Sequence, residues 1–368
     1  MINVWEYAAE FALEKQEIYE AIDTVFSSGR LILGPQTEAF EEKFAKWCGA
    51  NFSVGVGNGT DAIFLACKAL GLQSGDEVIT VANTAVPTVS AIVAAGGVPV
   101  FVDVNPDTYL MDINLVEKKI SAKTKLIIPV HLYGQMVDMD PLMALAGKYK
   151  IQVIEDCAQA HGAKYKGRTA GTIGDVAAFS FYPTKILGAY GDAGLCLTSN
   201  EVVRDKLRRL RFYGMEKNYY SIEHGYNSRI DELQAAILLK KLEHLTSYIK
   251  ARQKIARIYD HGLRGTSFIL PQSAPQNEHA YYLYVLRHSR RDEVIRLLSE
   301  KLINVNISYP WPIHTMKAFD HLQYKLGDLP HTELVAAEIF SLPMYPQLEE
   351  SQQFRVMDVL REIDHQLS

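Results

Sequence analysis

The sequence has few cysteines, no long apolar run and no block of charge of one sign, and each absence removes a class of protein. Its four cysteines, Cys48, Cys67, Cys157 and Cys196, stand apart and match neither a zinc-ligand spacing nor a disulfide framework. Isolated cysteines in apolar surroundings are typical of the reducing cytoplasm, so we expect a cytoplasmic protein without a metal site. No apolar stretch reaches the ~18 residues that a membrane helix requires, and residues 1–10 lack the pattern of a secretory signal.

The charge pattern argues against a nucleic-acid partner. The net charge is −5, and the basic cluster at residues 206–211 (KLRRLR) has leucines at helical spacing. That spacing predicts an exposed helix face, with nucleic-acid binding as the alternative. We therefore expect neither a membrane nor a nucleic-acid partner.

The sequence is instead rich in apolar residues that recur in a regular order. At 368 residues and 48% hydrophobic, it can bury a large core and would ordinarily divide into two domains. Short apolar strands alternate with helical patterns, which predicts an α/β fold with a mostly parallel sheet and helices on both faces. The strands are expected at residues 52–56, 77–81, 98–102, 126–130 and 151–155, and the helices at 61–70, 88–95, 114–120 and 141–150.

A long helical pattern at residues 231–259 is expected to lead into a second, smaller domain. A strand at 281–286, a helix at 291–301 and two further helices would make this a small α/β domain. We place the large domain at residues 1–245 and the small C-terminal domain at 246–368.

Lys185 lies in the most informative surroundings of the chain. Residues 178–185 (AFSFYPTK) predict an apolar strand end followed by a turn at Pro183. Residues 188–194 (GAYGDAG) then bring glycines, which leave room for a bound molecule to approach the backbone. A lysine in a mostly apolar loop suits Schiff-base chemistry, although a solvated lysine beside a glycine turn is the alternative.

Asp156 is the expected partner of Lys185. It follows the strand predicted at residues 151–155, and open α/β sheets bind ligands at the carboxyl ends of their strands. An acid at a strand end can equally be a helix N-cap. Lysine and carboxylate together, however, are what pyridoxal phosphate needs, because the lysine bonds to the cofactor and the carboxylate keeps the ring nitrogen protonated. The pair predicts a catalytic Lys185 and Asp156.

Five motifs in order give the chain a family resemblance. It resembles the sugar aminotransferases of the DegT/StrS family, within the aspartate aminotransferase-like fold type I of pyridoxal phosphate enzymes. The resemblance covers roughly residues 10–350 and implies that fold, with a large cofactor-binding domain. The motifs are residues 27–35 (SSGRLILGP), 57–62 (GNGTDA), 155–162 (EDCAQAHG), the Lys185 loop and 225–236 (GYNSRIDELQAA).

The resemblance also implies how the cofactor phosphate is bound. Gly59 and Thr60 lie between a strand and a helix, where free N–H groups and the helix dipole favour an anion. The alternative is a simple helix start capped by Thr60 or Asp61. By resemblance, Ser180 is a further phosphate ligand, and Asn227 reaches the phosphate from the neighbouring subunit. A homodimer with shared active sites follows.

Three more side chains near the ends of strands are candidates. Gln159 matches a family residue beside the cofactor ring. His161 is either a partner of Asp156 or a packing residue. His131 is open in the same way.

The substrate side of the site is less defined. Arg30 and Arg229 are candidates for the phosphates of a nucleotide-linked substrate, because guanidinium groups grip phosphate with two hydrogen bonds, although surface arginines are common. His314 matches a family histidine. The chain departs from relatives at residues 85–88 (AVPT), which lack the aromatic residue that often stacks on the cofactor, and at Ser308, where relatives often have histidine.

The resemblance implies a ping-pong aminotransferase. L-Glutamate would leave its amino group on the cofactor, and a nucleotide-linked keto sugar would accept it, with Lys185 moving the proton in both halves. Residues 131–135 (HLYGQ) resemble members that aminate C3 of dTDP-linked 3-keto-6-deoxysugars, for surface glycans such as O-antigen or for natural products. The alternatives are a C4 aminotransferase of a GDP-, UDP- or dTDP-4-keto sugar, and a cofactor-bearing regulatory protein.

Overall fold

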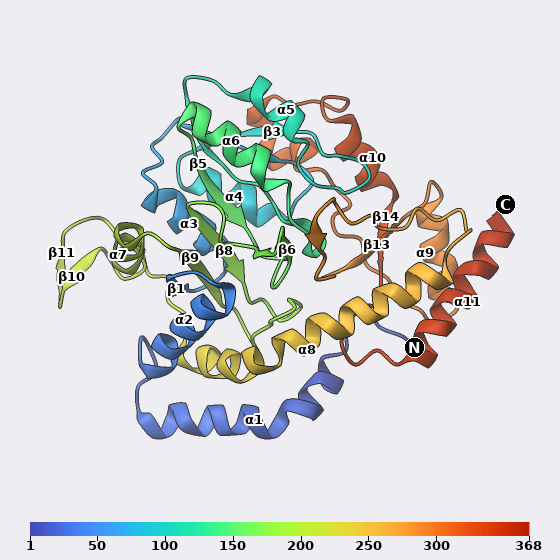
Figure 1. Ribbon diagram of the computed structural model, residues 1–368, viewed down its shortest axis with the longest axis horizontal. Coiled ribbons are helices and arrows are strands. Elements are labelled where there is room, and N and C mark those ends of the chain that lie inside the picture. Colours follow the sequence, from blue (N-terminus) through green and yellow to red (C-terminus); the bar gives the residue numbers. More distant parts are fainter. Residues whose placement is uncertain (368) are drawn as a thin grey trace.

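A seven-stranded sheet forms the centre of the computed structural model, which describes residues 1–367 (Figure 1). The strand order is β1-β9-β8-β5-β4-β2-β3. Neighbours from β8 to β3 pair in parallel, whereas β9 is antiparallel to both β1 and β8. The predicted, mostly parallel sheet is confirmed. Its strands are β1 (Phe52–Val56), β2 (Glu77–Val81), β3 (Val98–Val102), β4 (Thr124–Ile127), β5 (Gln152–Asp156), β8 (Val176–Ser180) and β9 (Gly194–Thr198).

Apolar side chains of the strands alternate between two layers, because successive residues of a strand point to opposite faces. In β2, Val78 packs in one layer and Ile79 in the other. The helices of the first layer are α3 (Gly59–Ala69), α4 (Val86–Ala94) and α7 (Glu201–Leu210). Those of the second include α2 (Pro35–Cys48) and α6 (Met139–Tyr149). Helices cover both faces, as predicted.

The long helix α8 (Glu232–Gly262) connects this body to a C-terminal unit (Figure 1). Leu245 and Ile249 still pack in the core of the sheet, whereas Ile255 already belongs to a separate C-terminal core. Ile2 packs in that second core as well and pairs with Ile303. The division at residues 245 and 246, which stays a prediction, would thus fall inside α8. The unit contains β13 (Tyr284–Arg287), α9 (Arg291–Glu300), α10 (Pro330–Glu338), β14 (Ile339–Leu342) and α11 (Glu350–Leu367).

Helix α1 (Tyr7–Ser28) runs alongside α8, at the edge of the molecule (Figure 1). Ile18, Ala21 and Val25 face Ala236 and Ile237 of α8. Short elements complete the chain: α5 (Ile113–Val116), η1 (Glu117–Lys119), η2 (Leu132–Gly134), β6 (Lys164–Tyr165), β7 (Arg168–Thr169), β10 (Met215–Lys217), β11 (Tyr220–Ser221), β12 (Asn277–Glu278), η3 (Ile313–Thr315) and η4 (Lys317–Leu322).

The basic cluster is only partly an exposed helix face. In α7, Leu207 is buried and Arg208 is exposed, as the spacing predicts. The prediction is wrong for Arg211, which is buried and forms an ion pair with Glu41. A buried arginine paired in this way belongs to the packing of the sheet edge and leaves less basic surface for a polyanion.

The remaining expectations from composition concern cysteines and membranes. All four cysteines are buried and unpaired. Among residues 1–367, no helix is both long and apolar enough to cross a bilayer.

Candidate active site

A cavity of about 870 Å³ lies at the carboxyl ends of the parallel strands. Asp156 is the last residue of β5 and Ser180 the last residue of β8, and both line it. Gly59, at the start of α3, and Thr88, in the first turn of α4, come from the helices that follow β1 and β2. Lys185 joins them from the loop after β8. The residues that the sequence pairs as lysine and carboxylate therefore lie in one cavity, where open α/β sheets bind their ligands.

Lys185 is held in place through both its backbone and its side chain. The Lys185 N–H donates to the Tyr182 carbonyl at 2.8 Å, and Nζ lies 4.6 Å from the centre of the Tyr282 ring. A Cβ on Gly188 would lie 2.3 Å from the Pro183 carbonyl oxygen, so only glycine allows this close turn. Gly188 is thus required for the path of the backbone after Lys185, and the Lys185 amine faces the cavity.

Asp156 is buried, with both carboxylate oxygens hydrogen-bonded. The Thr88 hydroxyl donates to Oδ2 at 2.8 Å, and the Ala158 N–H donates to Oδ1 at 3.1 Å. Burial raises the pKa of Asp156 above its usual value, while these two donors and the nearby Lys185 act to lower it. A cation beside the carboxylate would favour its ionised form further. The site suits a protonated ring nitrogen.

At another part of the cavity, a helix begins. Asn58 caps α3, because its Oδ1 accepts the Asp61 N–H at 2.9 Å. The alternative that Thr60 or Asp61 is the cap is wrong, and Gly59 and Thr60 instead form the first turn, whose N–H groups have no partner within the helix. A Cβ on Gly59 would lie 2.6 Å from Ser180 Cβ, so Gly59 and Ser180 are in contact. Such a helix start is favourable for a phosphate.

Asn227 does not line the cavity of its own chain. It is exposed and pairs with Phe212 in an antiparallel bridge. Its neighbour Ser228 is tied to the helix start instead, since the Ser228 hydroxyl accepts the Gly57 N–H at 3.0 Å and donates to Asp61 at 2.6 Å. The role of Asn227 in the active site of a neighbouring subunit stays a prediction.

The three candidate substrate residues also lie outside this cavity. Arg30 is exposed. The Arg229 guanidinium lies 5.3 Å from the centre of the Phe212 ring. His314 is buried and bonds to Glu333 at 2.9 Å. Their assignment to a substrate stays a prediction.

Gln159 lines the cavity between two fixed partners. Its Oε1 accepts the Tyr133 N–H at 2.8 Å, and its Nε2 donates to the Tyr309 hydroxyl at 2.8 Å. His161, in contrast, is fully buried against Phe179 and Phe181. Burial lowers the pKa of His161 to about 3, so its ring is uncharged. His161 acts as a packing residue here, without a hydrogen bond to Asp156 in the described chain.

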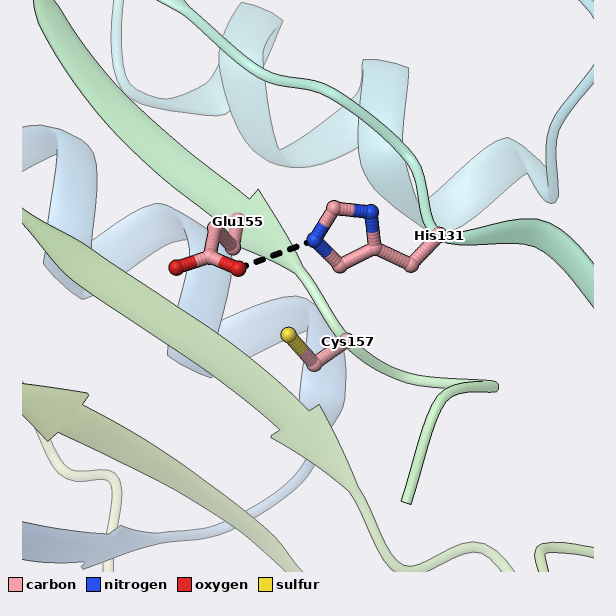
Figure 2. A group of neighbouring side chains, drawn as sticks. All are labelled: His131, Glu155 and Cys157. Carbon is pink, nitrogen blue, oxygen red and sulfur yellow. Dashed lines mark hydrogen bonds and ion pairs between the residues drawn. The ribbon is translucent and has the colours of Figure 1, made fainter. Parts of the chain in front are cut away.

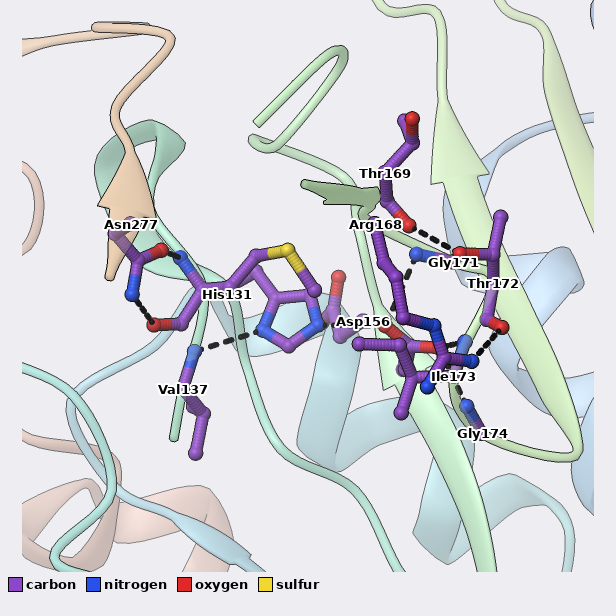
Figure 3. Close-up of polar contacts among 12 residues, drawn as sticks. His131, Val137, Asp156, Arg168, Thr169, Gly171, Thr172, Ile173, Gly174 and Asn277 are labelled. Atoms are coloured by element: carbon purple, nitrogen blue, oxygen red, sulfur yellow. Dashed lines mark hydrogen bonds and ion pairs between the residues drawn. The ribbon is translucent and has the colours of Figure 1, made fainter. Parts of the chain in front are cut away.

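His131, Glu155 and Cys157 form a buried group of side chains (Figure 2), and two of them flank Asp156 in the sequence. His131 Nε2 donates to Glu155 at 2.9 Å, and its Nδ1 accepts the Val137 N–H at 3.2 Å. Glu155 also accepts the N–H groups of Gly171, Ile173 and Gly174, three residues of one loop that are labelled in Figure 3. Burial acts to raise the pKa of Glu155, but these hydrogen bonds hold it below its usual range. Both His131 nitrogens and both Glu155 oxygens thus have hydrogen-bond partners. These hydrogen bonds join the segment after β4 to β5 and to the loop before β8.

The sequence patterns missed several residues of the cavity. Trp5 and Tyr282 line it from segments far from Lys185 in the sequence, and no local pattern indicates this. The sequence predicts Thr88 as the start of a helix and as part of a segment without an aromatic residue, but not as a partner of Asp156. That segment does line the cavity through Ala85 and Val86, so aliphatic side chains stand where relatives often have a ring.

These residues fit pyridoxal phosphate. Lys185 offers a primary amine, Asp156 a buried carboxylate for a cationic ring nitrogen, and Gly59, Thr60 and Ser180 a helix start for the phosphate. The cavity thus offers a carboxylate for the cationic ring nitrogen and N–H donors for the anionic phosphate of the same ligand. A cavity left only by the packing of the fold would not need both.

Comparisons with known proteins agree with this reading of the cavity. The model of the DegT/DnrJ/EryC1/StrS aminotransferase family matches residues 12–361. The dTDP-3-amino-3,4,6-trideoxy-alpha-D-glucose transaminase of Micromonospora megalomicea subsp. nigra is 51% identical over 98% of both chains. A pleiotropic regulatory protein of Geobacillus stearothermophilus is 43% identical over 98% of both chains. The crystal structure of S. venezuelae DesV in complex with a ketimine intermediate has a TM-score of 0.97 and 40% identity, covering 99% of this chain and 98% of DesV.

Proposed function

The chain belongs to the DegT/DnrJ/EryC1/StrS aminotransferase family, and on that basis we propose that it transfers an amino group from L-glutamate to C3 of a dTDP-linked 3-keto-6-deoxyhexose. It is a nucleotide-sugar aminotransferase that depends on pyridoxal phosphate. The observation that supports this most directly is the presence of Lys185 and Asp156 in one cavity. The choice of C3 is supported by the 51% identical relative, whose product carries its amino group at C3.

Each residue of the cavity would have a defined task. Pyridoxal phosphate, when bound, supplies an electron sink for negative charge at the carbon that bears the amino group. Asp156 would hold a proton on the ring nitrogen. The Lys185 amine would bond to the cofactor at rest and, once displaced, move a proton between the substrate carbon and C4′. Gly59, Thr60 and Ser180 would bind the phosphate, and Gln159 would lie beside the ring.

The assembly would be a homodimer that shares its active sites. Asn227 is exposed and outside its own cavity, which suits a residue that completes the site of a partner chain. Arg30 and Arg229 would bind the phosphates of the nucleotide-linked substrate, and His314 is a further candidate for a contact with that substrate. The enzyme would work in the cytoplasm and supply an amino sugar for a surface glycan or a natural product.

Purified enzyme loaded with pyridoxal phosphate tests the reaction. We expect glutamate and dTDP-3-keto-6-deoxyglucose to yield 2-oxoglutarate and a 3-amino sugar, detected by mass spectrometry and NMR. The 4-keto sugars linked to dTDP, UDP or GDP are the comparison substrates. Amination of a 4-keto sugar alone would replace the C3 proposal by the C4 alternative. A protein that binds the cofactor but turns over none of these sugars would favour the regulatory alternative.

A further inference from the structure

A chain of two threonines leads to the Asp156 carboxylate from the start of helix α4. Thr84 Oγ1 lies 2.9 Å from Thr88 Oγ1, and Thr88 Oγ1 lies 2.8 Å from Asp156 Oδ2. All three side chains are buried, with exposed fractions of 2%, 1% and 4%. Because an ionised carboxylate only accepts hydrogen bonds, Thr88 must donate to Asp156, and Thr84 must in turn donate to Thr88.

We propose that Thr88, supported by Thr84, is a positioning residue that holds the Asp156 carboxylate charged and aimed at the ring nitrogen of the cofactor. This inference rests on the proposed function, since it assigns the ring nitrogen to Asp156. Thr88 acts through Asp156 and is therefore distinct from the residues that bond to the cofactor or move its proton.

The geometry supports this role because the carboxylate is held from two separate elements. Thr88 fixes Oδ2 from α4, and the Ala158 N–H fixes Oδ1 from the turn after β5 at 3.1 Å. A carboxylate bound through only one oxygen could rotate away from a ligand. With both oxygens held, it keeps one orientation in the free protein, so less ordering is needed when a ligand binds.

The electrostatics point the same way. Burial raises the pKa of Asp156, and the Thr88 hydroxyl is the largest of the contributions that lower it, followed by Ala158 N–H, Lys185 and His131. Two other ionisable groups interact with this carboxylate, the Tyr309 hydroxyl and the Cys157 thiol, and burial is the main cause that raises the pKa of each. Removal of the Thr88 hydroxyl would therefore raise the pKa of Asp156 further and favour its neutral carboxyl form, which does not balance the charge of a protonated ring nitrogen.

Thr88→Val and Thr88→Ser test the inference as a matched pair. Valine keeps the shape and removes the donor, whereas serine keeps the donor. Thr80→Val is the control, because Thr80 is equally buried but its hydroxyl donates to the Ile128 carbonyl at 2.9 Å and not to Asp156. We expect Thr88→Val to weaken pyridoxal phosphate binding about tenfold, as a hydrogen bond to a charged group would. Thr88→Ser and Thr80→Val should stay within about twofold of the unaltered enzyme.

A second readout follows the ring nitrogen itself. In protein loaded with cofactor whose ring nitrogen carries an isotope label, the NMR shift reports how much of it is protonated. At the same pH, we expect a smaller share of the ring nitrogen to be protonated in Thr88→Val than in the unaltered enzyme, because the proton shifts towards Asp156, and we expect Thr88→Ser to restore it. If Thr88→Val does not fold, Thr84→Val, which removes the donor to Thr88, should show a smaller change in the same direction.

Equal binding and equal protonation in all variants would overturn the inference, as would a Thr80→Val loss of the same size. In that case the unaltered enzyme would still bind the cofactor and transaminate, so the proposed function would stand. An unaltered protein that binds no pyridoxal phosphate would overturn the proposed function itself.

Discussion

At the scale of single residues, the position of Lys185 leads to a direct test. Its amine faces the cavity and the Tyr282 ring, in a loop whose path is set by glycine. We expect the purified enzyme to be yellow and borohydride to fix the cofactor on the peptide that contains Lys185. Lys185→Ala should fold, lose this covalent label and lose transamination by several orders of magnitude. A label on another lysine would contradict the assignment.

Asp156 gives a second test, which separates rate from binding. Asp156→Asn keeps the size of the side chain, but an amide does not hold the ring nitrogen protonated. The cofactor should still bind, while kcat falls by about 100-fold or more and substrate KM changes little, since the loss belongs to the chemical step. Steady-state kinetics in both half-reactions measure this. A near-normal kcat would show that Asp156 has only a structural role.

His161 leads to a prediction about stability rather than rate. Burial lowers its pKa to about 3 from the ordinary 6.5, because the ring cannot be charged among Phe179 and Phe181. The unfolded chain binds a proton below pH 6.5 and the folded chain does not, so stability is full above pH 6.5 and is lost as pH falls towards 3. The loss should be on the order of 3 kcal/mol at pH 4 from this group.

Urea unfolding at several pH values measures this loss. His161→Leu, which has no titrating ring, should reduce the slope of the unfolding free energy between pH 6.5 and 4. Burial also lowers the pKa of His279 to about 3, so His279 should account for part of the slope that remains in this variant. An unchanged slope in His161→Leu would show that its ring is not kept neutral.

At the scale of helices and strands, the sequence predicted what short-range patterns determine. The predicted ranges of β1, β2 and β3 match the structure residue for residue, because each is a short apolar run bounded by turn residues. Lys185 and Asp156 were found together because both follow such strands. Strand β9 and helix α1 were missed. β9 directly follows a glycine-rich loop whose pattern indicates ligand binding rather than a strand. Helix α1 has only a narrow apolar stripe, which faces α8.

The rest of the cavity depends on contacts between distant parts of the chain. Trp5 and Tyr282 line it although both are far from Lys185 and Asp156 in the sequence. Thr88 bonds to Asp156 only because β2 and β5 lie on either side of β4. Residue patterns within one segment contain no record of such neighbours, so these residues could not be found from the sequence.

The hydrogen bonds between α8 and the start of α2 lead to a prediction about stability. The buried Glu232 carboxylate accepts the N–H groups of Gly34, Gln36 and Thr37 at 2.8, 2.9 and 2.8 Å, and so caps the start of α2 from another helix. Glu232→Gln removes the charge and one acceptor, which leaves a buried N–H without a partner. We expect a loss of about 2–3 kcal/mol in the free energy of unfolding.

Glu350→Gln is the matched control for this prediction. Glu350 is also in the first turn of a helix, but its ion pair with Lys254 is exposed, so its loss should cost less than about 1 kcal/mol. Equal effects of the two substitutions would show that Glu232 does not hold α2 in place.

At the scale of the whole molecule, the single chain leaves large apolar side chains exposed. Leu13 and Phe26 of α1 are 75% and 60% exposed, and Tyr219, in the hairpin of β10 and β11, is 89% exposed. The hairpin projects from the body of the molecule (Figure 1). Asn227 pairs with Phe212, which precedes this hairpin. Exposed apolar side chains of this kind are typical of surfaces that another chain covers, in line with the proposed homodimer.

If two subunits share their active sites, two inactive variants should regain activity when their subunits are mixed, which a monomeric enzyme could not do. If Asn227 completes the partner's site, Lys185→Ala and Asn227→Ala protein should each be inactive or nearly so. After subunit exchange, a mixed dimer would collect both defects in one site and neither in the other, because a two-fold interface places each residue in opposite sites. With random exchange of equal amounts, half of the dimers are mixed and about a quarter of all sites are intact. Transamination should therefore return to about a quarter of the normal rate. If Asn227 instead serves the cofactor of its own chain, every site in the mixture keeps one defect and no activity returns.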